Sequence, residues 1–298
     1  MTTADSAAVL SEPAGASSRP RIAAPAVPSA AAVTLALAKR EVVRFARQRS
    51  RWMGALLTPL VFWLLLGFGL DRAVTFAPTD AGAAEAASGG VASGGVGYLD
   101  YFLPGSLLLV VLFSSIFSTM TLIEDRRDGF LSAILASPAP RGAVVLGRVL
   151  GGAVVAWAQA GLFLLLAPVF GVSVTASGML LAWLAAGVAS LGLTAVGVWV
   201  AWPMTSTSAY HAVMNLVLMP AWLLSGAVFP PSSAAGPIQA AMYANPLTYA
   251  QAWLSGILQG PASAAGVGLP MWACGLAAGG AAGLALVGAA RVATRPAR

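Results

Sequence analysis

The sequence predicts an all-α membrane protein with six transmembrane helices. The chain of 298 residues is 58% hydrophobic and only 9% charged, whereas about a quarter of the residues in an ordinary soluble domain are charged. No Asp, Glu, Lys or Arg occurs between Val149 and Ala290. A soluble fold of that length could not keep its surface hydrated without charge, so this half of the chain must be surrounded by lipid.

Six apolar stretches are long enough to cross a bilayer core about 30 Å thick, which takes about 20 helical residues. The third stretch is long enough to tilt or to project from the membrane. The predicted spans are Trp52–Leu70, Tyr101–Ile123, Ala143–Phe170, Gly178–Ala201, Tyr210–Phe229 and Gly268–Ala290.

Lysine and arginine residues are concentrated on one side of these spans. They precede the first span, lie between the second and third, and follow the sixth, whereas the segments on the other side contain only Arg72. The positive-inside rule therefore predicts that both termini and the segment between spans two and three are cytoplasmic. This topology explains the net charge of +6 better than nucleic-acid binding does, so no nucleic acid is expected among the partners.

The charge and hydropathy pattern divides the chain into regions. Residues 1–30 are rich in Ala, Ser and Pro and have no apolar signal-peptide core, so they are expected to form a disordered cytoplasmic tail. The spans fill residues 52–290, and residues 291–298 are expected to form a short basic tail in the cytoplasm. On the outer side, residues 71–98 are rich in Gly, Ala and Ser, which predicts a flexible loop.

Residues 31–51 are too charged to span a membrane but have the period of an amphipathic helix. Such a helix lies on the inner membrane surface with its apolar face toward the lipid. The charged stripe is Arg40, Arg44, Arg47 and Arg51, and the opposite apolar face is Leu35, Ala38, Val42, Phe45 and Ala46. Amphipathicity alone leaves two interpretations open, an inert lipid anchor and a lever that also touches a cytoplasmic partner.

The cytoplasmic segment EDRRDGFLSAILASPAPR, residues 124–141, concentrates charge before a short apolar pattern. It opens with Glu124, Asp125, Arg126, Arg127, Asp128 and Gly129. A short helix is predicted next, with acidic residues near its start, where the helix dipole favours them. Pro138 ends that helix, whose apolar face is Phe130, Leu131, Ile134 and Leu135. Such a face can fill a groove of a partner protein, and the alternative is a hydrated loop that only fixes the topology.

The outer segment 230–267 contains two short apolar helical patterns separated at Asn245-Pro246. The residue before a proline is disfavoured in the α region, which predicts a break at this point. Neither piece is long enough to cross a membrane. We therefore expect two short helices that dip into the outer leaflet and pack against the rest of the protein.

The sequence offers no set of catalytic, metal-binding or nucleotide-binding residues. His211 is the only histidine and no carboxylate follows Asp128, so neither a Ser-His-Asp triad nor a metal cluster can be assembled in the second half. The only lysine, Lys39, has no P-loop glycines around it. We predict no catalytic residue, no metal site and no cofactor bound by this chain, so energy for any work must come from outside the chain.

His211 and Asn215 are four residues apart and share one face of the fifth predicted span. A hydrogen bond to a neighbouring helix is the favoured interpretation, because polar groups within spans commonly make such ties. Direct contact with a substrate is the alternative.

Three motifs occur in a characteristic order along the chain. TPLVFWLLLGFGL, residues 58–70, follows the basic amphipathic helix; the charged segment 124–141 precedes VLGRVLGG; and NPLTY, Asn245–Tyr249, lies between spans five and six. In this order, and with six spans, the chain from Ala31 to Arg295 resembles the permease, or membrane subunit, of type-2 ABC transporters. These ABC-2 proteins include exporters of drugs, lipids and polysaccharides.

The resemblance implies a half-transporter in the bacterial cytoplasmic (inner) membrane. It would pair with a second permease copy, identical or closely related, and with separate ABC ATP-binding subunits that bind the ATP and Mg²⁺. The segment from Glu124 to Leu135 would be the coupling helix seated on the ATPase, and residues 31–51 the connecting helix. The outer re-entrant helices that help close the exit would contain Asn245, Pro246, Leu247, Thr248 and Tyr249.

The expected function is ATP-driven export of an amphipathic or hydrophobic cargo, because an apolar, uncharged path suits such molecules. An ATP-independent secondary transporter is a second possibility, although such proteins usually carry intramembrane charges on the ion path. A non-transporting membrane assembly protein is a third. Binding to an ATPase would distinguish the first possibility from the other two.

Overall fold

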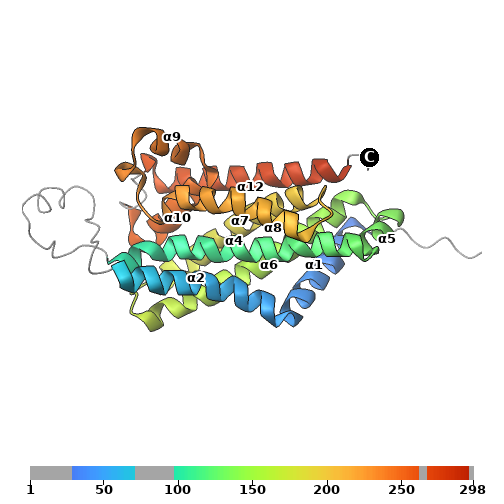
Figure 1. Cartoon of the computed structure of the whole chain (residues 1–298), viewed down its shortest axis with the longest axis horizontal. Coiled ribbons are helices and arrows are strands. Elements are labelled where there is room, and N and C mark those ends of the chain that lie inside the picture. The colour runs from blue at the N-terminus through green and yellow to red at the C-terminus, as the bar shows by residue number, and fades with distance from the viewer. Residues whose placement is uncertain (1–28, 71–96, 262–266, 295–298) are drawn as a thin grey trace, which may run out of the picture.

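The computed structural model describes residues 29–70, 97–261 and 267–294. Within these ranges the chain is helical and contains no strand, and most of the long helices run side by side along the molecule (Figure 1). Nearly all of the predicted N-terminal tail and outer loop, residues 1–28 and 71–96, lie outside the described ranges, as do the last four residues of the predicted basic tail.

Five helices in the described ranges are long and apolar enough to cross a membrane. They agree with the predicted spans one to four and six, and the third is extended by a 3₁₀ turn, η1 (Ala167–Phe170). These helices are α2 (Arg49–Leu70), α4 (Tyr98–Arg127), α6 (Arg141–Leu166), α7 (Ala176–Ala201) and α12 (Met271–Thr294).

The fifth predicted span, Tyr210–Phe229, is not among these five helices, because it is interrupted. Helix α8 (Thr207–Trp222) has 16 residues and is therefore about 24 Å long. It continues into a π-helical turn, η2 (Leu223–Ala227), in which Gly226 has φ 88°. A positive φ is easily reached by glycine and ends regular helix geometry.

Helix α4 is the central helix of the bundle and packs against α2, α6, α7 and α8. Its buried polar residues tie neighbouring helices together. Ser114 donates to the side-chain oxygen of Gln159 on α6, and the Gln159 amide donates to the carbonyl of Trp52 at the start of α2 (2.9 Å). A hydrogen bond of 3.1 Å also joins Thr194 of α7 to Ser115.

Helix α1 (Ala30–Arg47) packs tightly on α6 instead of lying on lipid alone. The close approach requires glycine on α6, because a Cβ at Gly151 would lie 2.6 Å from Cβ of Glu41. Within the predicted apolar face, Leu35 is 72% exposed, whereas Phe45 is buried in the protein. Glu41, which lies outside that face, is also buried, as is Leu37. Arg51 belongs to α2, since α1 ends at Arg47.

The short helices lie at opposite ends of the bundle (Figure 1). Helix α5 (Phe130–Ala136) is at the end where α1 crosses, and α9 (Gly236–Ala244) is at the other. A 3₁₀ turn, η3 (Pro231–Ser233), precedes α9, and α10 (Pro246–Gln259) follows it and packs against α7 and α12. The prediction of two short helices separated at Asn245-Pro246 is therefore confirmed.

Candidate functional site

Charged side chains from four helices meet at the end of the bundle that contains α1 and α5. The group comprises four arginines and three carboxylates joined by ion pairs, and is called here the inner charge cluster. Its members are Arg40, Glu41 and Arg44 on α1, Arg51 on α2, Glu124 and Asp125 on α4, and Arg148 on α6.

Asp125 is the centre of the cluster and is 1% exposed. Arg40 donates to both of its carboxylate oxygens, at 2.7 and 2.9 Å, and Arg44 donates to one of them at 2.6 Å. Arg148, which is also buried, donates to Asp125 and, at 2.8 Å, to Glu41. A buried carboxylate is tolerated only when it is paired and hydrogen-bonded in this way.

Glu124 and Asp125 lie in the last turn of α4, so the prediction that they sit near the start of the following helix is wrong. The C-terminal end of a helix carries partial negative charge and disfavours carboxylates. The arginines of α1 and α2 compensate: Glu124 accepts from Arg44 (2.8 Å) and from Arg51. With that compensation the helix continues past the end of its apolar sequence.

Arg126 and Arg127 hold the connection between α7 and α8. Arg126 donates to the carbonyls of Trp202 and Met204, the latter at 3.2 Å. The Nε of Arg127 donates to the Thr205 carbonyl at 2.9 Å. These two arginines therefore satisfy loop carbonyls within the chain.

The apolar face of α5 is directed into the protein. Leu131 is fully buried, and Phe130, Ile134 and Leu135 pack against the core. The guanidinium of Arg40 lies 3.8 Å from the centre of the Phe130 ring, a cation–π contact that joins α5 to α1. The surface left for a partner is the other side of the segment, formed by Arg127, Asp128, Ser132, Ala133 and Ala136.

At the opposite end, the break in α8 leaves backbone carbonyls that side chains of neighbouring helices satisfy. Tyr98 and Tyr101 of α4 donate to the carbonyls of Val228 (3.3 Å) and Gly226 (2.9 Å). From the α9–α10 region, Asn245 donates to Ala221 (2.5 Å) and Thr248 to Leu224 (3.3 Å). Irregular backbone at membrane depth is stable only with such partners.

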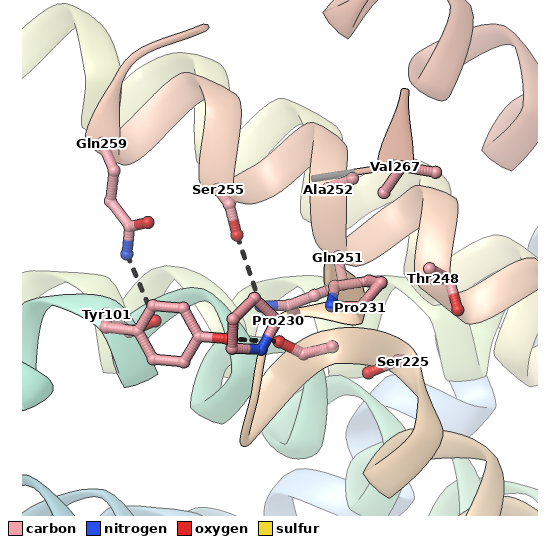
Figure 2. Close-up of a pocket in the computed structure, with 11 residues that line it drawn as sticks. Tyr101, Ser225, Pro230, Pro231, Thr248, Gln251, Ala252, Ser255, Gln259 and Val267 are labelled. Atoms are coloured by element: carbon pink, nitrogen blue, oxygen red, sulfur yellow. Dashed lines mark hydrogen bonds between the residues drawn. The ribbon is translucent and has the colours of Figure 1, made fainter. Parts of the chain in front are cut away.

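A small hollow of about 50 Å³ lies beside this break (Figure 2), which is room for a few water molecules. Gln259 spans one side of it and donates to the carbonyl of Asp100 at 2.6 Å. Pro104 leaves that carbonyl without its usual helical donor. Gln251 faces the hollow and is 4% exposed. Its Oε1 has no hydrogen-bond partner in the described part of the chain.

The NPLTY residues join α9 to α10 and fix both to α8. Asn245 caps α10 by accepting from the backbone N–H of Leu247 (3.1 Å), and Pro246 is the first residue of α10. Besides its contact with α8, Thr248 donates to the carbonyl of Met242 in α9 (2.6 Å). Tyr249 donates to the Tyr243 carbonyl (2.7 Å). Tyr98, Tyr101 and Gln259, which complete the arrangement, were not predicted, because only the unforeseen break gives them a role.

His211 and Asn215 lie on α8 next to α4, where an aromatic contact takes the place of the expected interhelical hydrogen bond. The His211 ring lies 5.7 Å from the ring of Phe117. Both Nδ1 of His211 and Oδ1 of Asn215 are buried and lack a hydrogen-bond partner among the described residues. The ring that carries the unpartnered Nδ1 therefore lies beside Phe117, and the unpartnered Oδ1 of Asn215 is one helical turn further along α8.

The family model for ABC-2 type transporters matches residues 32–258 of this chain. The chain belongs to the ABC-2 type transporter family. The match extends from α1 to α10, so this ABC-2 chain carries both the inner charge cluster and the capped break within the family's own region. No curated protein matches it. The chain is the membrane component of a transporter, a multi-pass permease of a family that in general works with an ABC ATPase.

Neutralising Asp125 should destabilise the inner end of this permease. We expect Asp125→Asn to lower the free energy of unfolding by about 3 kcal/mol, because Arg148 keeps its charge and loses a buried partner. Asp128→Asn, an exposed acid in the same segment, is the matched control and should change it by less than about 0.5 kcal/mol. Thermal unfolding of purified protein measures both. Additive effects of Asp125→Asn and Arg148→Gln in a double-mutant cycle would contradict the coupling.

Removing the Asn245 side chain should loosen the outer break. Asn245→Ala leaves the Ala221 carbonyl without its donor and removes the cap of α10, at a cost of about 1–2 kcal/mol. Hydrogen exchange of the backbone amides in residues 223–228 should become faster. Gln239→Ala on α9, whose side chain contacts only Tyr243 by a hydrogen bond, is the control. Equal exchange rates in the two variants would show that Asn245 does not hold the break.

Proposed function

We propose that this chain is the permease subunit of an ATP-driven exporter in a bacterial inner membrane. In this proposal a separate ABC ATP-binding subunit hydrolyses ATP, with Mg²⁺, and a second permease copy completes the transport path. The observation that carries it is the rigid connection of α5 to the spans: Phe130 to Arg40, and Arg40 to the buried Asp125. A short cytoplasmic helix held in this way can pass a push from a partner into the membrane helices.

The proposed topology has six spans with both termini in the cytoplasm. Five crossings are the long helices described above. The remaining crossing, the fifth in chain order, is α8 together with η2, residues 207–227, which span about 30 Å. The arginines at the end with α1 and α5 support a cytoplasmic position for that end.

Energy would enter at the exposed side of α5 and reach α1, α4 and α6 through the inner charge cluster. Within this scheme, four residues make no direct contact with the ATPase. They hold together the helices that α5 moves, and they are Glu124, Asp125, Arg126 and Arg127. The direct contact with the ATPase is assigned to the exposed side, from Asp128 to Ala136. In this scheme α1 is the connecting helix. It transmits the motion to α4, because Arg40 and Arg44 of α1 form ion pairs with α4.

The outer end would form the gate. In this part of the proposal, residues Asn245, Pro246, Leu247, Thr248 and Tyr249 belong to re-entrant helices that close the exit. Support comes from the capped break, since α8 is held there by neutral hydrogen bonds that can be exchanged at low cost.

The cargo is proposed to be amphipathic or hydrophobic. The side of α8 that faces away from the bundle is apolar, with Leu216 and Val217 more than half exposed. His211 and Asn215 would offer the few polar contacts beside Phe117 that a cargo with a hydrogen-bonding group needs.

Placing a bulky charge on the exposed side of α5 should prevent the ATPase from binding. We expect Ala133→Arg to reduce co-purification with the co-expressed ABC ATP-binding subunit at least tenfold, because a partner surface fitted to alanine cannot accept it. Ala240→Arg, an exposed alanine on the outer helix α9, should leave co-purification unchanged. Unaltered binding of Ala133→Arg would disprove the contact assigned to α5.

Removing both polar groups of α8 should impair transport without affecting ATPase binding. In His211→Ala/Asn215→Ala we expect efflux of amphipathic fluorescent dyes from cells to fall about tenfold, the equivalent of about 1.4 kcal/mol. Ser208→Ala, which removes an exposed hydroxyl from the same helix, serves as the control. If efflux is unchanged in the double variant, these residues have no part in cargo contact.

A further inference from the structure

The inner charge cluster contains more positive than negative charge. Four arginines are paired with three carboxylates, which leaves one surplus cation in a largely buried group. The Nε of Arg148 is buried and has no hydrogen-bond partner within the described ranges. Surplus charge held away from water is unfavourable unless an anion lies nearby. The cluster therefore predicts an anionic ligand at its accessible side.

A groove of about 370 Å³ runs along the accessible side of the cluster. Its lining residues recur at positions i, i+3, i+4, i+7 and i+8 along α1 and its C-cap, which is the spacing of one side of a helix. They are Arg40, Val43, Arg44, Arg47 and Gln48. Arg47 is exposed, and no ion pair joins it to a described residue. Its guanidinium adds a second cation that no described residue neutralises.

Gln48, which lines the groove, also carries an unsatisfied hydrogen-bond acceptor. Oε1 of Gln48 is buried and has no partner in the part of the chain that the structure describes. A ligand that matches the groove therefore carries an anion for the arginines and a hydroxyl that donates to this oxygen.

The surroundings of the groove are those of a membrane surface. Val43, which lines the groove, is exposed, and so is Leu35 on the same helix. Exposed apolar side chains next to arginines are typical of helices that lie between lipid headgroups and acyl chains. An acidic segment of a soluble partner would leave these apolar side chains in water.

We propose that this groove binds the headgroup of an anionic phospholipid that carries hydroxyl groups, with phosphatidylglycerol as the fitting example. The phosphate lies between Arg44 and Arg47 and compensates the surplus charge of the cluster. A glycerol hydroxyl of the headgroup donates to Oε1 of Gln48. The lipid thus becomes the fourth anion of the cluster and fixes α1 to the inner leaflet. This inference does not depend on the proposed coupling to an ATPase.

Native mass spectrometry of the purified full-length permease, with phosphatidylglycerol or phosphatidylcholine added, tests the proposal. Wild-type protein should retain several-fold more phosphatidylglycerol. Arg47→Gln should lower that preference at least threefold. Arg141→Gln, which removes an exposed arginine outside the groove at the start of α6, should leave it intact. Because Arg47 is exposed, its substitution should not alter the unfolding temperature, which is measured in parallel.

Three further comparisons identify the ligand. Gln48→Leu should remove the preference for phosphatidylglycerol over phosphatidic acid, which lacks the headgroup hydroxyls, while binding of phosphatidic acid persists. Soluble glycerol phosphate should not displace the lipid, since it lacks the acyl chains. Equal losses in Arg47→Gln and Arg141→Gln would mean diffuse charge attraction and would overturn the proposed site. Equal retention of phosphatidylglycerol and phosphatidylcholine by the wild-type protein would overturn it as well.

Discussion

The contact between Asp125 and Arg148 is the constraint on which the end of the bundle that contains α1 and α5 depends. Neither group is stable when buried alone, because removing a charge from water costs several kcal/mol. Arg148 is on α6 and Asp125 on α4, so these helices must meet at this level. Glu41 then balances Arg148, and since Glu41 is on α1, the same requirement brings α1 against α6. The glycines at 147 and 151 allow the backbone approach that this contact needs.

The same cluster determines which surface of the charged segment is available to another protein. The carboxylates of Glu124 and Asp125 are engaged by arginines, while Arg126 and Arg127 hold the α7–α8 connection. Arg40 at the same time covers Phe130, which keeps the apolar face of α5 inside. The charged segment thus joins four helices, and the side of α5 that remains exposed is formed by Ser132, Ala133 and Ala136.

Hydropathy and charge were sufficient to predict the helical membrane fold and the position of most spans, because these depend on local composition. The break at Asn245-Pro246 was also predictable, since proline acts on the residue next to it. Two features were not. A buried Glu41 is acceptable only because Arg148 lies beside it, more than a hundred residues along the chain. The break after Trp222 is acceptable only because Tyr98, Tyr101, Asn245 and Thr248 satisfy its carbonyls. A pattern in a short stretch of sequence cannot reveal partners that lie so far away along the chain.

The two ends of the bundle are held by different interactions, and the difference predicts where the molecule moves. Breaking a buried ion pair costs about 3–5 kcal/mol, and the inner cluster contains several that share partners. A neutral hydrogen bond contributes about 1 kcal/mol, and the outer break is held by bonds of this kind around a hollow that has room for water. A water molecule can replace each lost partner in turn at the outer end, whereas no water can replace Arg148 beside Asp125. Helices α1, α4 and α6 should therefore move as one body, and the change of shape should be concentrated where α8 breaks.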